Sequence, residues 1–260
     1  MIKIENTKVE GWEPAIRGMR NPLNSWQKSD SYMGYDCHSC DIFIKNGVCH
    51  KEDRGPHCEE FYGIEIGPND KDLMKRLASA GKDHAKYRRM IVVYADLIAP
   101  LYWWKEYDTY KVGTVANSCS TMHKIQAKEF VRDDFSWEHL FSFMHEDELE
   151  LESYCMALSD KEDGSVVQFK KYPVDILDET IFALNFYREK FLETKDKRYW
   201  WQMIQLLPSS YNQRRTVMLN YEVLANIYHA RKNHKLDCWH TFCDWIETLP
   251  ESWIITGEKE

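Results

Sequence analysis

The chain has 260 residues, of which 43% are hydrophobic and 29% are charged, and this composition predicts a globular protein with a substantial core rather than a disordered chain. The formal net charge of -8 disfavours an extended nucleic-acid surface, because such a surface normally needs a basic patch. The sequence lacks both a run of the roughly 20 apolar residues that span a bilayer and the apolar region of a signal peptide. We therefore expect a soluble, cytoplasmic protein that does not insert into a membrane.

The first predicted elements are a short strand over residues 2–4 and a helix over residues 12–19. Two arginines, Arg17 and Arg20, then stand close to Trp26. Guanidinium groups bind carboxylates and phosphates through paired hydrogen bonds, so this segment is a candidate anion contact. The alternative is an ordinary solvated loop.

Residues 36–60 are rich in cysteine and poor in large apolar residues, and we interpret them as an insertion within one domain of residues 1–260. The spacing is C-x2-C-x8-C-x8-C, and a two-residue gap presents both sulfurs of a pair to one metal ion. We predict a structural zinc site, with an iron–sulfur cluster and free or redox thiols as alternatives. A catalytic zinc is disfavoured, because four cysteines leave no open coordination position. The predicted ligands are Cys37, Cys40, Cys49 and Cys58, one of which is replaceable by His38, His50 or His57.

The next predicted helix is capped by Asn69 or Asp70 and closed by Gly81. An apolar, β-branched run over residues 90–97 predicts a buried strand. His84 lies between these elements and follows an aspartate that is able to orient its imidazole for proton transfer. A surface or capping role is the alternative.

An aromatic helix is predicted to begin at Pro100. Successive helical residues point about 100° apart, so we expect one of Trp103 and Trp104 to face the core and the other a cleft or partner, unless both are ordinary packing residues. Residues 111–123 are small, polar and rich in hydroxyls. Such a composition lets backbone amides approach a ligand, although it also suits a connecting loop.

The second half of the chain is predicted to be mainly helical. A Leu-Pro step at residues 207–208 ends one helix, and Ser209 or Ser210 caps the next. Cys238 and Cys243 are interpreted as packing residues of the last helix. The fold class is thus α+β, mainly helical with a small central sheet. The predicted helices cover residues 130–160, 178–193, 199–207, 212–231 and 236–249, and residues 165–169 are extended.

Several of these stretches resemble the flavin-dependent thymidylate synthases, also called thymidylate-synthase-complementing proteins. Residues 207–211 (LPSSY), 219–224 (LNYEVL) and 230–231 (AR) are similar to the family's Leu-Pro, Asn-x-Arg-x-Leu and closing Arg pattern. The aromatic helix that leads into residues 111–122 is similar in position to the family's flavin- and nucleotide-binding segment. Key arginines are missing: Thr109-Tyr110-Lys111 stands where the family has Arg-His-Arg, Thr121-Met122 replaces Arg-Tyr, and Glu222 replaces the arginine of Asn-x-Arg.

The resemblance implies the family's fold, a nucleotide and FAD as ligands, and assembly into a homo-oligomer like the family's tetramers. If the chain is catalytic, the resemblance implies hydride or one-carbon transfer to a pyrimidine nucleotide, with the flavin as the reactive partner. The alternative is a non-enzymatic interaction or inhibitor protein that keeps the fold without catalysis. Lys111 and Arg231 would meet phosphate, and Glu222 would accept a hydrogen bond from a base or ribose. The full set of expected pocket residues is Arg17, Arg20, His84, Lys111, Thr114, Asn117, Ser118, Ser120, Asn220, Glu222 and Arg231.

Overall fold

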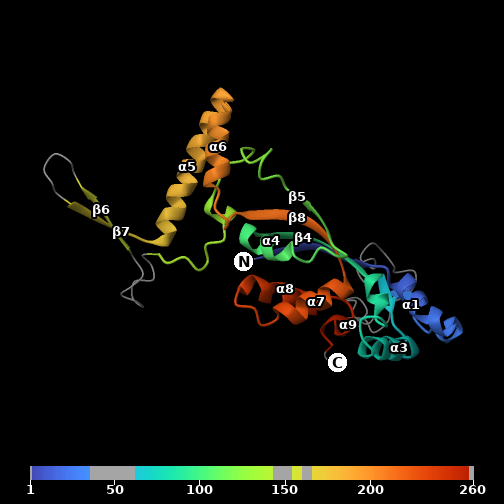
Figure 1. Cartoon of the computed structure of the whole chain (residues 1–260). Helices are drawn as coiled ribbons and strands as arrows, with labels where there is room; N and C mark the ends of the chain where they lie inside the picture. Colours follow the sequence, from blue (N-terminus) through green and yellow to red (C-terminus); the bar gives the residue numbers. More distant parts are fainter. Residues whose placement is uncertain (1, 36–61, 143–153, 160–165, 258–260) are drawn as a thin grey trace, which may run out of the picture. The chain divides into compact units, whose positions relative to one another are not determined.

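The structure is a computed structural model that describes residues 2–35, 62–142, 154–159 and 166–257 (Figure 1). The chain forms two compact units, each assembled from three separate pieces of sequence. Unit 1 comprises residues 1–4, 96–109 and 116–216, and unit 2 comprises residues 5–95, 110–115 and 217–260. A four-stranded sheet with the order β1-β4-β8-β5 contributes residues to both units. Its strands are β1 (Lys3–Glu10), β4 (Val92–Pro100), β8 (Asn212–Asn220) and β5 (Val115–Ser118).

The mixed helix and sheet architecture confirms the α+β prediction, but the long helix predicted over residues 212–231 is wrong in its first half. Residues 212–220 form β8, and the helix α7 (Tyr221–Arg231) begins only afterwards. Gln213, Val217 and Leu219 are buried at strand-like spacing along β8, a period-2 pattern that a helix reading overlooks. Asn220, and not Ser209 or Ser210, caps α7, because its side chain accepts a hydrogen bond from the amide of Val223.

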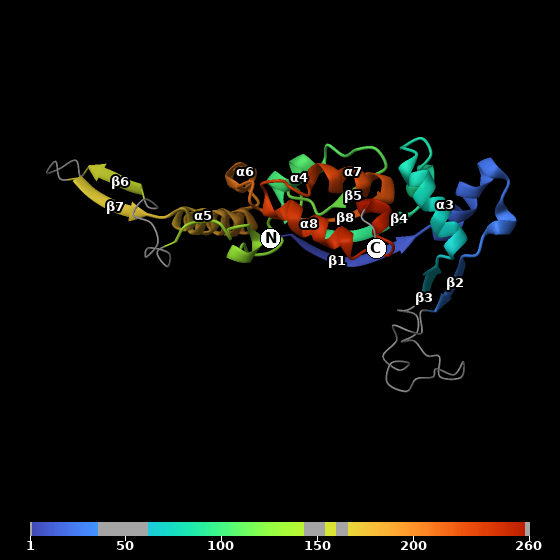
Figure 2. The same ribbon diagram turned by 90° about the horizontal axis from the view of Figure 1, so that it is seen from below.

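Unit 1 is built around a helical hairpin in which α5 (Pro173–Thr194) and α6 (Lys197–Leu206) lie side by side (Figure 2). Both helices were predicted, although α5 begins earlier than expected because Pro173 suits the first helical turn. The unit also contains α4 (Leu101–Tyr107), the 3-10 turn η7 (Arg132–Asp134) and an antiparallel pair of β6 (Tyr154–Ser159) and β7 (Val166–Lys171). Its apolar core is formed by Ile125, Phe130, Phe135, Leu177, Leu184 and Met203.

In unit 1 the helix predicted over residues 130–160 is wrong, and the two tryptophans follow the alternative that both are packing residues. In the described part of residues 130–160 the chain is irregular apart from η7 and β6, because its backbone amides bond to other elements. For example, the amide of Phe130 donates to the side chain of Asn185 at 2.9 Å. Trp103 and Trp104 are both buried, at 0% and 1% exposure, so neither faces a cleft or a partner. The ring nitrogen of Trp104 donates to the carbonyl of Gln213 at 3.0 Å, which satisfies its polar edge inside the core.

Unit 2 has its own buried core, and most side chains of α7 are buried in it. The rings of Trp12 and Tyr221 pack edge to face at 5.4 Å, and α7 also packs against α8 and α9. Cys238 and Cys243 of α8 are buried, as expected of packing residues. The elements of unit 2 are α1 (Trp12–Arg20), η1 (Asn21–Leu23), η2 (Trp26–Lys28), β2 (Tyr32–Tyr35), β3 (Tyr62–Glu65), α3 (Pro68–Ser79), η6 (Lys86–Arg89), α7, α8 (Asp237–Glu247) and α9 (Trp253–Thr256).

The strands β2 and β3 form an antiparallel hairpin, with Tyr35 opposite Tyr62 at the end where the chain connects the two strands. The predicted Cys-rich insertion falls between these two strands and lies outside the described residues. Across the described ranges of both units, no helix combines the length and apolar character needed to cross a membrane.

Candidate functional site

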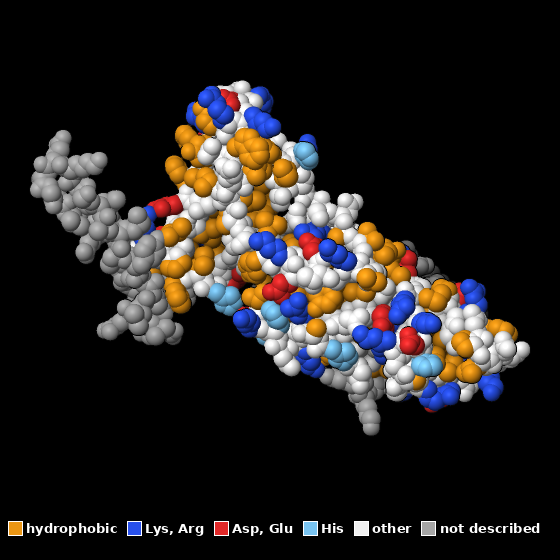
Figure 3. All heavy atoms as spheres, viewed as in Figure 1, with side chains coloured by type: hydrophobic (Ala, Val, Ile, Leu, Met, Phe, Trp, Pro, Cys, Tyr) orange, Lys and Arg blue, Asp and Glu red, His pale blue; other side chains and the backbone are white. Residues whose placement is uncertain are grey.

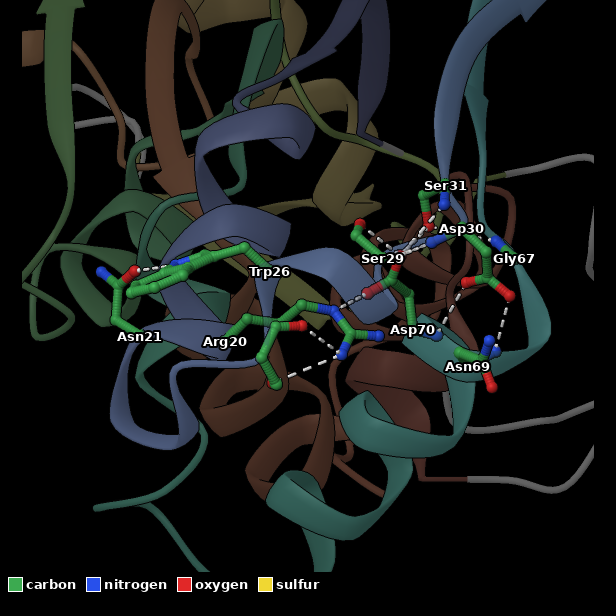
Figure 4. Close-up of polar contacts among 10 residues, drawn as sticks. Arg20, Asn21, Trp26, Ser29, Asp30, Ser31, Gly67, Asn69 and Asp70 are labelled. Carbon is green, nitrogen blue, oxygen red and sulfur yellow. Dashed lines mark hydrogen bonds and ion pairs between the residues drawn. The ribbon is translucent and has the colours of Figure 1, made fainter.

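Asp70, in the first turn of α3, is the centre of a buried hydrogen-bond network in unit 2 (Figure 4). One carboxylate oxygen accepts from the Nε of Arg20 at 2.5 Å. The other accepts from the hydroxyls of Ser29 at 2.8 Å and Ser31 at 2.7 Å, and from the amides of Asp30 and Ser31, each at 3.0 Å. The Asp70 and Arg20 side chains are only 0% and 4% exposed. The network therefore joins α1, α3 and the segment that enters β2.

Hydrogen bonding keeps Asp70 ionised inside this network. Burial alone would raise the pKa of its carboxyl, but the hydrogen bonds from Ser31, Ser29 and Arg20 outweigh burial, and the pKa lies below its ordinary value. A carboxylate that accepts several hydrogen bonds stays charged at neutral pH. Arg20 is thus paired with an ionised carboxylate inside the protein.

The start of α3 explains how the network is held. The carboxylate of Asp30 accepts from the amides of Asn69 at 2.9 Å and Asp70 at 3.1 Å, so it satisfies two of the free amides at the start of the helix. The prediction that Asn69 or Asp70 caps this helix is therefore wrong. The capping carboxylate belongs to Asp30, which lies 39 positions before Asn69 and 40 before Asp70. Gly67 is needed here, since a Cβ at this position would lie 2.2 Å from the Asp30 side chain.

A cavity of about 170 Å³ adjoins the network. Two predicted site residues line it. Arg20 is buried, and its Nη2 atom has no hydrogen-bond partner among the residues that the structure describes. Arg17 is exposed at 68% and makes a loose ion pair of 3.9 Å with Glu13, one turn earlier on α1. The remaining lining residues are Glu13, Ile16, Trp26, Ser29, Ser31, Tyr32, Met33 and Ile64.

A second polar cluster of unit 2 lies where residues 110–114 fold against α7. The Nε of Arg231 donates to the hydroxyl of Tyr110 at 2.9 Å, and its guanidinium carbon lies 4.8 Å from the ring centre of Trp239. The Thr114 hydroxyl donates to the carbonyl of Tyr110 at 2.6 Å. Arg231 is thus held by two aromatic rings.

Gly113 brings the same segment against the cap of α7. Its φ of +78° belongs to the left-handed region, and a Cβ there would lie 2.5 Å from the Nδ2 of Asn220. Glycine is therefore required twice over, by backbone conformation and by the close approach. Three expected pocket residues, Thr114, Asn220 and Arg231, consequently belong to one contiguous cluster.

The other expected pocket residues are more scattered. In unit 2, His84 and Lys111 are exposed, whereas Glu222 is buried in the first turn of α7 at 8% exposure. In unit 1, Asn117 and Ser118 are exposed on β5. The Ser120 hydroxyl accepts from the amides of Met122 at 3.3 Å and His123 at 2.9 Å, so it stabilises a local turn.

Local sequence patterns do not mark several residues of these clusters. They indicate Asp70 only as a helix cap, and they do not indicate Asp30 or Trp239 as site residues. Their partners lie far away in sequence, at separations of 50 residues for the Arg20–Asp70 bond and 39 for the Asn69–Asp30 bond. Only the concentration of Ser and Asp at residues 29–31 hinted at a local network.

The predicted zinc ligands Cys37, Cys40, Cys49 and Cys58 lie outside the described residues, so the zinc site remains a prediction. Within the described ranges, no group of three or more His, Cys, Asp or Glu side chains is arranged to hold a metal ion.

The arrangement of elements matches solved flavin-dependent enzymes. A crystal structure of thymidylate synthase X (ThyX) from Helicobacter pylori with FAD and dUMP aligns with a TM-score of 0.57 at 13% identity, covering 99% of this chain and 98% of that one. A second H. pylori ThyX structure, complexed with FAD and dUMP, aligns with a TM-score of 0.58 at 13% identity over 98% of each chain. The chain has a ThyX-like fold.

The ThyX likeness confirms the fold that the sequence resemblance implied. At 13% identity it extends to the fold alone. No protein-family model and no curated protein sequence matches the chain. The activity of ThyX therefore does not follow from the likeness.

Proposed function

We propose that this protein binds a pyrimidine nucleotide, FAD or both, as a divergent ThyX-like protein. The proposal is supported by the likeness to ThyX over nearly the whole of both chains. The observation that carries it is the cluster of residues 110–114 and α7. There Thr114, Asn220 and Arg231, all chosen from sequence, are linked through Tyr110 and Gly113.

The chemistry of this cluster suits the phosphate end of a nucleotide or flavin. Lys111 is exposed beside Gly113, and Arg231 is held by Tyr110 and Trp239. These two cations would contact phosphate oxygens, since charge-assisted hydrogen bonds are the strong ones. Glu222 would accept a hydrogen bond from a base or ribose hydroxyl. When bound, the flavin would supply the redox chemistry.

Isothermal titration calorimetry with FAD and with dUMP tests this proposal. We expect binding of at least one ligand, and Lys111→Ala should weaken it roughly 10-fold or more, because a charged hydrogen bond contributes about 1.5–3 kcal/mol. Lys105→Ala removes another exposed lysine, on α4, and should leave binding unchanged. Colourless protein that binds neither ligand would overturn the proposal. Mass spectrometry of dUMP incubated with the flavin-loaded protein, a one-carbon donor and a reductant of the flavin would separate binding from turnover.

The second candidate function is that of an interaction protein, and a specific surface favours it. Hydrophobic side chains gather over α5 and α6 of unit 1 (Figure 3). Phe182 is 75% exposed, an unusual state for a phenylalanine in a helix. Other exposed apolar residues of these two helices are Ile176, Phe186, Leu192, Trp201 and Leu206. We propose that this face supports self-association or a macromolecular partner, in keeping with the homo-oligomer expected from the resemblance.

Light scattering coupled to gel filtration tests the self-association. If copies associate through this face, Phe182→Asp should shift the particle toward the monomer, because it would bury a charge in an apolar contact. Glu189→Ala, also at an exposed position of α5, should not. A wild-type protein that is monomeric at micromolar concentration would contradict self-association. In that case, a partner that binds the wild type but not Phe182→Asp would favour an interaction protein.

A further inference from the structure

We propose that the cavity beside Arg20 binds a small, flat, uncharged aromatic ligand that carries a carbonyl oxygen, of the benzamide type. Its walls come from α1, η2 and the β2–β3 hairpin of unit 2. The proposal does not rest on the nucleotide or flavin function, because the size, lining and charge of the cavity define its ligand. It also revises the anion contact expected for Arg17 and Arg20.

The volume selects a single ring. At about 170 Å³, the cavity is close to an engineered cavity of about 150 Å³ that binds benzene. One six-membered ring with a small substituent fits this space.

The apolar side of the lining suits a flat ring. Trp26 is held by a hydrogen bond of 2.8 Å from its ring nitrogen to the Asn21 side chain, which fixes the indole at the cavity (Figure 4). Tyr32 and Met33 contribute an aromatic ring and a thioether from β2, and both remain partly exposed. Aromatic rings and methionine sulfur make favourable contacts with a bound ring.

The charges around the cavity cancel, which argues against a phosphate or carboxylate. The Arg20 guanidinium lies 2.5 Å from the Asp70 carboxylate. The Arg17 side chain faces Glu13 at 3.9 Å, so this second positive charge also has a negative neighbour. The hydroxyl donors of Ser29 and Ser31 are already committed to Asp70. An anionic ligand would lose its hydration without finding a net positive charge.

One buried hydrogen-bond donor beside the cavity is unpaired. Arg20 is buried at 3% exposure, and its Nη2 has no acceptor among the described residues, whereas its Nε and Nη1 bond to Asp70 and Ser25. Buried donors are usually satisfied, so an unpaired one on a residue that lines a cavity indicates a missing acceptor. A neutral carbonyl oxygen on the ligand would supply it without adding charge.

Benzamide and benzoate form a matched pair for the test, because they share size and shape and differ in charge. Titration of the full-length protein, followed by saturation-transfer NMR, should show benzamide binding with a dissociation constant of about 1 mM, typical of so small a ligand. Benzoate should bind at least 10-fold more weakly. Equal or tighter binding of benzoate would overturn the proposal, as would no binding of benzamide.

Two variants locate the site. Met33→Trp should fill the cavity from the hairpin and abolish benzamide binding, whereas Met122→Trp, at another exposed methionine, should not. Arg20→Lys keeps a positive charge beside Asp70 but removes the Nη2 donor, so benzamide affinity should fall about 10-fold. Circular dichroism would establish that each variant is folded. Benzamide binding that survives Met33→Trp in folded protein would place the ligand elsewhere and refute the assignment.

Discussion

Replacing Asp70 with asparagine tests whether the buried network holds unit 2 together. The substituted amide would keep one acceptor oxygen but remove the negative charge that lies 2.5 Å from Arg20. Because both side chains are at most 4% exposed, Arg20 would be left as a buried charge without its counterion. Breaking a buried ion pair by removing one partner costs about 3–5 kcal/mol. We therefore expect the free energy of unfolding to fall by about this amount.

Urea unfolding followed by circular dichroism measures the change. Asp72→Asn is the matched control, since Asp72 lies on the same helix and pairs with Arg76 at 2.9 Å on the surface, with both side chains at least 65% exposed. Exposed pairs contribute about 0–1 kcal/mol, so this control should change little. If Asp70→Asn costs no more than Asp72→Asn, the claim that the Arg20–Asp70 pair anchors unit 2 is refuted.

The same carboxyl predicts a pH dependence. Folding lowers the pKa of Asp70, so its contribution to stability is fully present above the unfolded value of about 3.9. That contribution should be lost as the pH falls below this value and through the lower folded pKa. Asp70→Asn should therefore lose less stability than the wild type over this acidic range. Parallel curves for the two proteins would contradict the assignment.

Three further predictions concern other parts of the chain. Gly113→Ala should destabilise the protein more than Gly81→Ala. Alanine at a positive φ costs about 1–2 kcal/mol at either position, but only Gly113 also abuts Asn220. Equal losses of unfolding free energy in urea would contradict the contact. Tyr110→Phe should cost about 1–3 kcal/mol by removing the acceptor of Arg231, and an unchanged unfolding midpoint would refute this. Metal analysis of purified protein should find about one equivalent of zinc, released by chelators, and less than a tenth of an equivalent would refute the predicted site at Cys37, Cys40, Cys49 and Cys58.

Local patterns in the sequence were sufficient for many elements. Helices α1, α5, α6 and α8 and strands β4 and β7 follow from apolar periodicity and from proline at helix starts. The helix predicted over residues 212–231 is wrong in its first half because β8 runs directly into α7 after Asn220, so the sequence offers no turn signal between them. Residues 130–142 contain enough apolar residues for a helix, yet bonds such as that between Phe130 and Asn185 draw the backbone away from helical pairing.

The sequence alone also indicated part of the candidate site. The motif resemblance selected Thr114, Asn220 and Arg231, which the structure brings into one cluster. The anion contact predicted for Arg20 came from its guanidinium alone, because the sequence does not show which groups surround that guanidinium.

What the sequence determined was the α+β class, most of the helices and the likeness to the flavin-dependent thymidylate synthases. These depend on short-range periodicity and on motifs whose residues are close together in the sequence. Only the tertiary structure showed that Asp30 caps a helix 39 positions away and that Asp70 neutralises Arg20 across 50 positions. The physical reason is that burial and charge balance depend on which distant side chains share one low-dielectric interior, and no local pattern records that.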